Sequence, residues 1–114
     1  MGELMAGKVA LVSGSTRGIG RSIAEHLAAQ GARVVVTGRT AEKGEKVATR
    51  IREAGGTAEF LRLDVTDEDS VRSVIEETVR RFGGLTTLVN NAAPTEVVAT
   101  TARPIWSAPS IEAR

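Results

Sequence analysis

The sequence predicts an α/β protein built on a doubly wound parallel sheet. Short apolar runs alternate with segments of helical period from residue 9 to residue 89, and no repeat or low-complexity segment interrupts them. Such alternation is typical of parallel βαβ units. A glycine-rich segment, residues 13–20, joins the first strand to the first helix. We therefore expect four parallel strands in the spatial order 3-2-1-4, with helices on both faces of the sheet.

The first strand and the first helix follow from two simple patterns. Residues 9–12 are an apolar run that suits a strand buried on both faces. Ile19, Ile23 and Leu27 then recur at every fourth position, which is the spacing of one face of a helix. Gly31 follows as the stop signal expected at a helix C-terminus.

The second strand, second helix and third strand repeat this order. Val34–Val36 is a run of β-branched residues, which favours a strand. Val47 and Ile51 lie one turn apart on a second helix that stops at residues 55–56, both glycine. Phe60–Leu63 is the predicted third strand.

The third helix has the strongest period of the three. Its apolar face is formed by Val71, Val74, Ile75, Thr78, Val79 and Phe82. Thr66, with Asp69 three residues later, resembles a capping box at the N-terminus of this helix. Two glycines at 83–84 end the helix, and Leu85–Val89 is the predicted fourth strand.

The glycine-rich segment is the best candidate for a functional site. A helix N-terminus binds anions because its backbone N–H groups point outward and its dipole favours negative charge. Gly14 permits a tight turn, Gly18 lets the backbone approach a pyrophosphate, and Gly20 lets the helix pack against the strand. A plain glycine-rich turn is the alternative, since a glycine triplet alone is weak evidence. The position at a strand-to-helix junction favours phosphate binding.

The spacing of these glycines resembles that of the short-chain dehydrogenase/reductase family. Three further matches follow in that family's order: Asp64-Val65 after the third strand, the stretch 61–67 that resembles the end of the family's third strand, and residues 90–93, Asn-Asn-Ala-Ala, after the fourth. In the family, the aspartate contacts adenine and the asparagine stretch lines the cofactor site. The resemblance covers roughly residues 7–93. Within the family, the chain resembles members that are similar to 3-oxoacyl-acyl-carrier-protein reductases. The resemblance implies a Rossmann-like fold, here truncated because family members are longer.

The resemblance also implies a set of cofactor contacts and a choice of cofactor. An acidic residue after the second strand would bind the ribose hydroxyls of NAD and repel a 2′-phosphate. Gly38 stands at that position here. Arg39 and Arg17 match positions where NADP-preferring members carry arginine, a residue that suits phosphate contacts. The alternative interpretation is that both are solvated surface arginines. We therefore expect NADP(H). The predicted contacts are Gly14, Ser15, Thr16, Arg17, Gly18, Ile19, Gly20, Arg39, Asp64, Val65, Asn90 and Ala92.

The family's catalytic pair does not occur in this chain. Its hydride transfer between NADP(H) and a carbonyl or alcohol uses a Tyr-x-x-x-Lys motif, in which lysine lowers the pKa of tyrosine. The chain has no tyrosine, and its last lysine is Lys46. We predict no catalytic residue and no activity. A piece of a longer oxidoreductase, a truncated or frame-shifted product, and a non-catalytic nucleotide-binding or regulatory interaction module all remain open.

Composition narrows the classes of partner and location. The net charge is +1, which favours neither nucleic acid nor an acidic membrane surface. There is no cysteine, and His26 is the only histidine, so we predict no metal site. No apolar run reaches membrane-spanning length or resembles a signal peptide, and we expect a cytoplasmic protein.

The predicted domain ends before the last part of the chain. All three prolines and the only tryptophan lie in residues 94–114, where no period continues. We therefore assign residues 1–93 to an NADP-binding domain and residues 94–114 to an irregular tail. The fourth strand, interior in the family, is expected at an edge here, where it is available for self-association.

Overall fold

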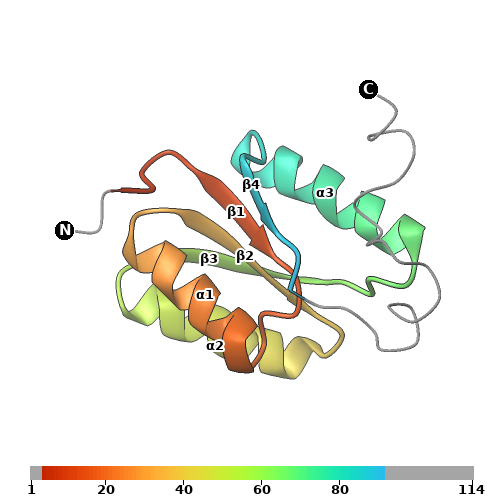
Figure 1. The fold of residues 1–114 in the computed structure, drawn as a ribbon, viewed down its shortest axis with the longest axis horizontal. Coiled ribbons are helices and arrows are strands. Elements are labelled where there is room, and N and C mark those ends of the chain that lie inside the picture. The colour runs from red at the N-terminus through yellow and green to blue at the C-terminus, as the bar shows by residue number, and fades with distance from the viewer. Residues whose placement is uncertain (1–3, 92–114) are drawn as a thin grey trace.

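The computed structural model describes residues 4–91 as a four-stranded sheet with helices on both faces (Figure 1). In chain order, the elements are β1 (Val9–Val12), α1 (Gly18–Ala29), β2 (Arg33–Gly38), α2 (Ala41–Glu53), β3 (Thr57–Arg62), α3 (Glu68–Phe82) and β4 (Thr87–Val89). No helix in this part of the chain has the length and apolar character needed to cross a bilayer. The predicted tail, residues 94–114, lies outside the described residues.

The sheet is parallel throughout, and its order is β3-β2-β1-β4. β1 is central: Leu11 lies opposite Val35 of β2 on one side and Leu88 of β4 on the other. The predicted order 3-2-1-4 is therefore confirmed. Because all strands run the same way, their carboxyl ends meet at one edge of the sheet.

Alternate side chains of the central strands enter two separate cores. Ala10 and Val12 of β1 pack with α1 and α2, whereas Leu11 packs with α3. On β2, Val34 belongs to the first core and Val35 to the second. These five side chains are fully buried. Helices cover both faces of β1 and β2, which explains why these strands are continuous apolar runs.

The buried face of α1 differs from the predicted one. Ile19 is 74% exposed, while Ile23 and Leu27 are only partly buried at the margin of the first core. The fully buried positions are the small residues Gly20, Ala24 and Ala28. Small side chains let the helix lie close to the sheet, so the larger ones flank this contact instead of forming it.

The predicted capping box at Thr66 is not formed. The N-cap of α3 is Asp67, whose carboxylate accepts hydrogen bonds from the backbone N–H groups of Asp69 and Ser70. Thr66 instead donates its hydroxyl to Asp64 at 2.6 Å. Helix α3 therefore begins one residue later than a Thr66 cap would place it.

Three strand lengths also differ from the prediction, and β2 comprises Arg33–Gly38 rather than Val34–Val36. β3 begins at Thr57 rather than Phe60, and its side chains alternate between more and less buried positions. β4 comprises Thr87–Val89 rather than Leu85–Val89. The apolar run at 60–63 marks only the second half of β3, because a strand at the edge of a sheet tolerates polar residues.

Candidate functional site

The predicted site segments converge at the carboxyl edge of the sheet. The glycine-rich loop leaves β1 at Ser13, Arg39 follows β2, Asp64 lies two residues beyond β3, and Asn90 follows β4. Between β1 and β4 the sheet changes its direction of growth. In open α/β sheets, ligands bind outside the carboxyl ends of the strands at this switch point.

Buried hydrogen bonds hold the glycine-rich loop against β2. The backbone N–H of Ser15 donates to the carbonyl of Thr37 at 2.9 Å. The Ser15 hydroxyl donates to the carbonyl of Val12 at 2.7 Å and accepts from the N–H of Thr37 at 2.8 Å. The Thr37 hydroxyl also donates to Val12, at 2.7 Å. Ser15, predicted as a cofactor contact, thus shapes the loop, together with Thr37, which the sequence pattern did not indicate.

The three glycines satisfy two different geometric requirements. Gly14 has φ 64° and Gly18 has φ 61°, values in the left-handed region that favours glycine. A Cβ on Gly20 would lie 2.2 Å from the carbonyl oxygen of Gly14 and 2.7 Å from Nδ2 of Asn91. Only glycine therefore fits where the first turn of α1 touches the loop, whereas the sequence predicted a packing role for Gly20 against the strand.

Asn91 connects the end of β4 to the same loop. Its backbone N–H donates to the hydroxyl of Ser13 at 2.7 Å, and its side-chain amide donates to the carbonyl of Gly14 at 3.3 Å. The N–H of Ser13 donates to the carbonyl of Val89 at 3.0 Å. Asn91 belongs to the predicted motif 90–93 but was not among the individual predicted contacts. Its signal in the sequence is a polar residue two positions after an apolar strand.

The N-terminus of α1 is open to solvent beside the loop. Arg17 is the N-cap, and no side-chain hydrogen bond caps this helix in the described part of the chain. Arg17, Gly18 and Ile19 are exposed. The first N–H groups of a helix lack intrahelical partners and carry partial positive charge. This end of the helix therefore suits an anion.

Arg39 and Asp64 face each other across the ends of β2 and β3. Nη2 of Arg39 lies 3.8 Å from Oδ1 of Asp64. The same oxygen accepts hydrogen bonds from the hydroxyl and the N–H of Thr66, at 2.6 and 3.0 Å. These hydrogen bonds, with a smaller contribution from Arg39, lower the pKa of the Asp64 carboxyl below its usual value. Asp64 is therefore an ionised acceptor next to a cation that is 65% exposed.

The remaining predicted contacts differ in their accessibility. Val65 is half-buried against the second core, and Asn90 is exposed after β4. Ala92 lies outside the described residues. Thr16 is half-buried, and its methyl carbon would lie 2.5 Å from a Cβ on Gly38. Gly38 therefore allows the loop to approach β2, besides placing no acidic group there.

This chain and its fold have counterparts among known proteins. A family model described as short chain dehydrogenase matches residues 8–106. The 3-oxoacyl-[acyl-carrier-protein] reductase of Haemophilus influenzae is 46% identical over 91 residues, which cover 80% of this chain and 36% of the reductase. The NADP-dependent (R)-specific alcohol dehydrogenase of Lentilactobacillus kefiri is 45% identical over 94 residues, which cover 81% of this chain and 36% of that enzyme.

A solved structure leads to the same comparison. The hydroxysteroid dehydrogenase from Escherichia coli superposes with a TM-score of 0.77 at 34% identity, covering 79% of this chain and 38% of its own. The chain thus spans little more than a third of the length of these proteins.

Proposed function

Because the chain belongs to the short chain dehydrogenase family, we propose that residues 1–93 form the NADP(H)-binding domain of an oxidoreductase. The reaction class is hydride transfer between NADP(H) and a carbonyl or alcohol group. The observation that carries this proposal is the uncapped N-terminus of α1, shaped by three glycines at the switch point of the sheet.

Each part of this edge has its own task in the proposal. The N–H groups at the start of α1 bind the pyrophosphate, while Ser15 and Gly20 hold the loop in position. Arg17 and Arg39 bind the 2′-phosphate, and Asp64 accepts a hydrogen bond from adenine. The bound cofactor would supply the hydride. The proposed contacts are those predicted from the sequence: Gly14, Ser15, Thr16, Arg17, Gly18, Ile19, Gly20, Arg39, Asp64, Val65, Asn90 and Ala92.

The preference for NADP(H) is the finer part of this proposal. Two features support it: the absence of a carboxylate at Gly38 and an exposed guanidinium at Arg39. One relative, the L. kefiri enzyme, is NADP-dependent by name. A charged hydrogen bond to the 2′-phosphate is worth about 1.5–3 kcal/mol. We expect NADPH to bind at least about tenfold more tightly than NADH.

Replacing Arg39 with Asp tests this preference. The variant should bind NADH more tightly than NADPH in a fluorescence titration, because a carboxylate repels the 2′-phosphate and accepts from ribose hydroxyls. Arg72→Asp on α3, an exposed arginine paired with Asp69, is the matched control and should keep the original preference. Equal affinities for both cofactors, before and after the Arg39 change, would reject the role of Arg39.

We further propose that these 114 residues bind the cofactor without turning it over. They contain no tyrosine, so the Tyr-x-x-x-Lys pair on which the family's chemistry relies is not among them. This absence also favours the second candidate function, a non-catalytic nucleotide-binding or regulatory interaction module. NADPH oxidation measured with a panel of ketones should stay at the level of the blank. Measurable ketone reduction by the purified, mass-verified chain would contradict the proposed lack of turnover and would also reject the non-catalytic module.

A further inference from the structure

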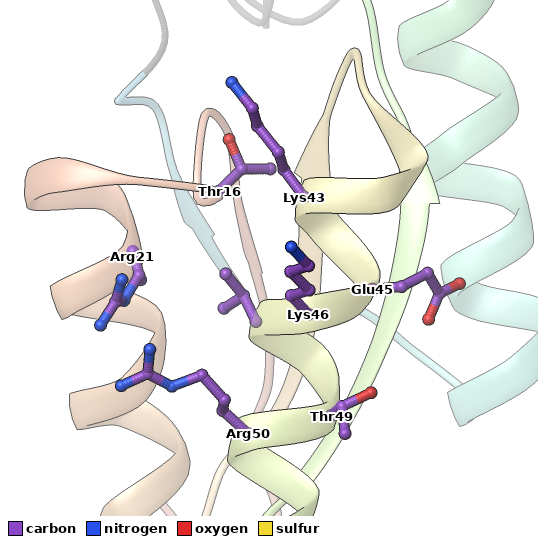
Figure 2. A pocket seen from close by; sticks show the side chains of 8 residues that line it. Thr16, Arg21, Lys43, Glu45, Lys46, Thr49 and Arg50 are labelled. Atoms are coloured by element: carbon purple, nitrogen blue, oxygen red, sulfur yellow. The ribbon is translucent and has the colours of Figure 1, made fainter.

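A groove lies between helices α1 and α2, next to the glycine-rich loop. This α1–α2 groove has a volume of about 490 Å³, within the range of small-molecule sites (Figure 2). It is lined by Thr16, Arg21, Lys43, Glu45, Lys46, Val47, Thr49 and Arg50. Apart from Thr16, every lining residue comes from one of the two helices.

Basic side chains dominate the lining of the groove. Lys43 and Lys46 have no carboxylate within ion-pair distance among residues 4–91. Arg21 and Arg50 approach each other across the groove and share one carboxylate, that of Glu25, at 3.1 and 4.0 Å (Figure 2). Both pairs join an arginine Nε to Oε2 of Glu25, and only the Arg21 pair is short enough to be a hydrogen bond.

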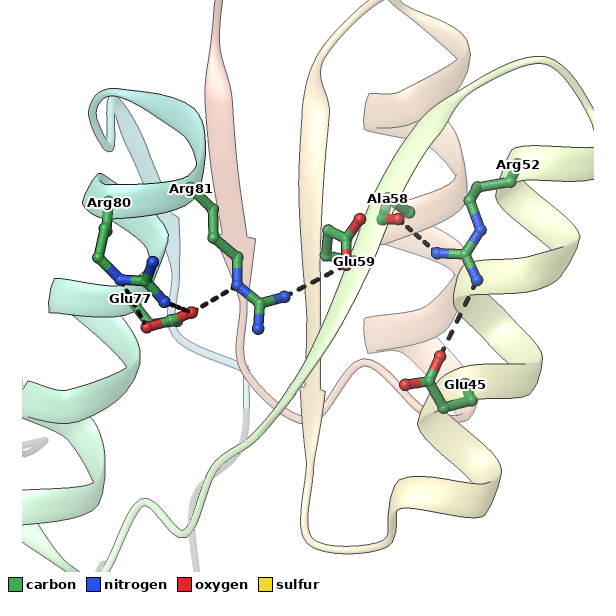
Figure 3. A network of polar contacts seen from close by, with 7 residues as sticks. All are labelled: Glu45, Arg52, Ala58, Glu59, Glu77, Arg80 and Arg81. Atoms are coloured by element: carbon green, nitrogen blue, oxygen red, sulfur yellow. Dashed lines mark hydrogen bonds and ion pairs between the residues drawn. The ribbon is translucent and has the colours of Figure 1, made fainter.

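The single acidic residue in the lining points away from the basic ones. Glu45 extends toward β3 and pairs with Arg52 at 3.9 Å (Figures 2 and 3). Thr16 also belongs to the lining, whereas the hydroxyl of Thr49 accepts a hydrogen bond from Arg52 at 3.3 Å. The groove therefore brings four cations together, and a bound anion would relieve their mutual repulsion.

The groove is distinct from the proposed cofactor site. Thr16 is the only residue that belongs to both. The charged side chains assigned to the cofactor, Arg17, Arg39 and Asp64, do not line the groove. A ligand here would contact α1 and α2, and Thr16 would be its contact with the glycine-rich loop at the carboxyl edge of the sheet.

We propose that the α1–α2 groove binds the phosphate monoester group of a small molecule, at a site separate from the cofactor. Guanidinium groups present paired donors that match phosphate oxygens, and ammonium groups add compact charge. Arg21 and Arg50 supply the first, Lys43 and Lys46 the second. This inference does not rest on the proposed oxidoreductase function, because it uses none of the charged cofactor residues.

A titration of the ¹⁵N-labelled full chain with inorganic phosphate, at constant ionic strength, tests the proposal by NMR. Saturable shifts should appear at the backbone amides of Arg21, Lys46 and Arg50. Lys46→Met and Arg50→Met should each weaken phosphate binding by up to about fivefold, the value of an exposed charge pair. Combined, they should weaken it about tenfold.

A matched control removes one lysine and one arginine elsewhere. Lys8→Met combined with Arg72→Met makes the same change in net charge, and both residues are exposed and outside the groove. The control pair should leave phosphate binding unchanged. Equal weakening in both double variants, or shifts that sodium chloride reproduces, would mean diffuse attraction to a basic protein and would overturn the proposal.

NADPH and NADH distinguish the groove from the cofactor site. The Lys46→Met, Arg50→Met double variant should bind NADPH and NADH with the same affinities as the unaltered chain. A loss of NADPH affinity with NADH affinity unchanged would assign the groove to the 2′-phosphate of the cofactor, and the separate site would be wrong. Each single variant offers the same readout, and both side chains are exposed, so the fold should persist.

Discussion

Two glycines lie inside helices of this fold because of the atoms that face them. A Cβ on Gly20 of α1 would meet the carbonyl oxygen of Gly14 at 2.2 Å, and a Cβ on Gly44 of α2 would meet the ring of Phe60 at 2.0 Å. Glycine costs a helix about 1 kcal/mol relative to alanine. Because glycine has no Cβ, α1 can contact the glycine-rich loop closely and α2 can contact β3 closely.

Replacing Gly20 with Ala should lower the free energy of unfolding by about 1–3 kcal/mol, the usual cost of overpacking. The higher helix propensity of alanine does not offset this, because the opposing atom belongs to the backbone and has little room to move. The displaced loop should also bind NADPH more weakly. Urea unfolding and a fluorescence titration measure the two effects.

Two other glycines provide controls for this prediction. Gly84→Ala introduces a Cβ with no atom within 4 Å and should change stability by less than about 1 kcal/mol. Gly44→Ala should destabilise the fold through Phe60 and leave the NADPH affinity of the folded protein intact. If Gly20→Ala binds NADPH as tightly as the unaltered chain, its role in shaping the loop is wrong.

The periodic spacing of apolar residues predicted which strands and helices exist better than it predicted which of their faces are buried. All seven strands and helices of residues 4–91 were predicted, because burial on one or two faces imposes a period on the sequence. The buried face of α1 was not, since the pattern ranks Ile19 above Gly20 and the sheet selects the smaller residue. The contacts of Thr37, and those of Asn91 within the predicted motif 90–93, were missed because they depend on which strands become neighbours.

The N-cap of α3 can be tested against that of α2. Asp67→Ala removes the acceptor for two backbone N–H groups and should lower stability by about 0.5–2 kcal/mol. Thr40→Ala at the N-cap of α2 should cost less, because Thr40 makes no side-chain capping hydrogen bond. Chemical denaturation compares the two variants. A larger loss for Thr40→Ala would contradict the assignment of Asp67 as the cap.

A pH-dependent contribution to stability should come from Glu77 on α3. Its carboxylate accepts hydrogen bonds from Arg80 and Arg81, and Arg81 also pairs with Glu59 of β3 at 3.3 Å (Figure 3). Hydrogen bonds from Arg80 first, and then Arg81, lower the pKa of Glu77 from 4.5 to about 2. The network thus links α3 to the sheet most strongly when Glu77 is ionised.

The sign follows from a folded-state pKa below the unfolded one. Ionised Glu77 stabilises the fold above pH 4.5, and this contribution is lost as the pH falls toward 2. The stability difference between the unaltered chain and Glu77→Gln should therefore shrink over that interval in denaturation curves. Glu76→Gln, at a neighbouring position without an ion pair in residues 4–91, should show no such trend. A constant difference for Glu77→Gln would refute the shift.

Across the whole molecule, the two edges of the described sheet are protected to different degrees. At β3, Arg52 donates to the carbonyl of Ala58 at 2.7 Å, and Glu59 pairs with Arg81 (Figure 3). β4 has only three residues, its hydrogen bonds run to β1, and Leu88 is 39% exposed. From the sequence, strand order and family membership were predictable, because the glycine-rich loop and the alternation of strands and helices specify them together. The relative exposure of the two sheet edges was not predictable, since it depends on side chains of α2 and α3.

We therefore predict that the 114-residue chain self-associates by pairing at β4. An edge strand with unpaired backbone groups is a template for another chain, and charged side chains are a usual protection against it. Leu88→Lys should shift sedimentation-velocity profiles toward the monomer at high concentration, because it places a charge where two copies would meet. Thr57→Lys is the control, since it adds the same charge to the exposed start of β3.

If the unaltered chain is monomeric at every concentration, β4 is not an interaction edge. If Thr57→Lys disperses the association as well as Leu88→Lys, net charge explains the effect, and pairing at β4 does not.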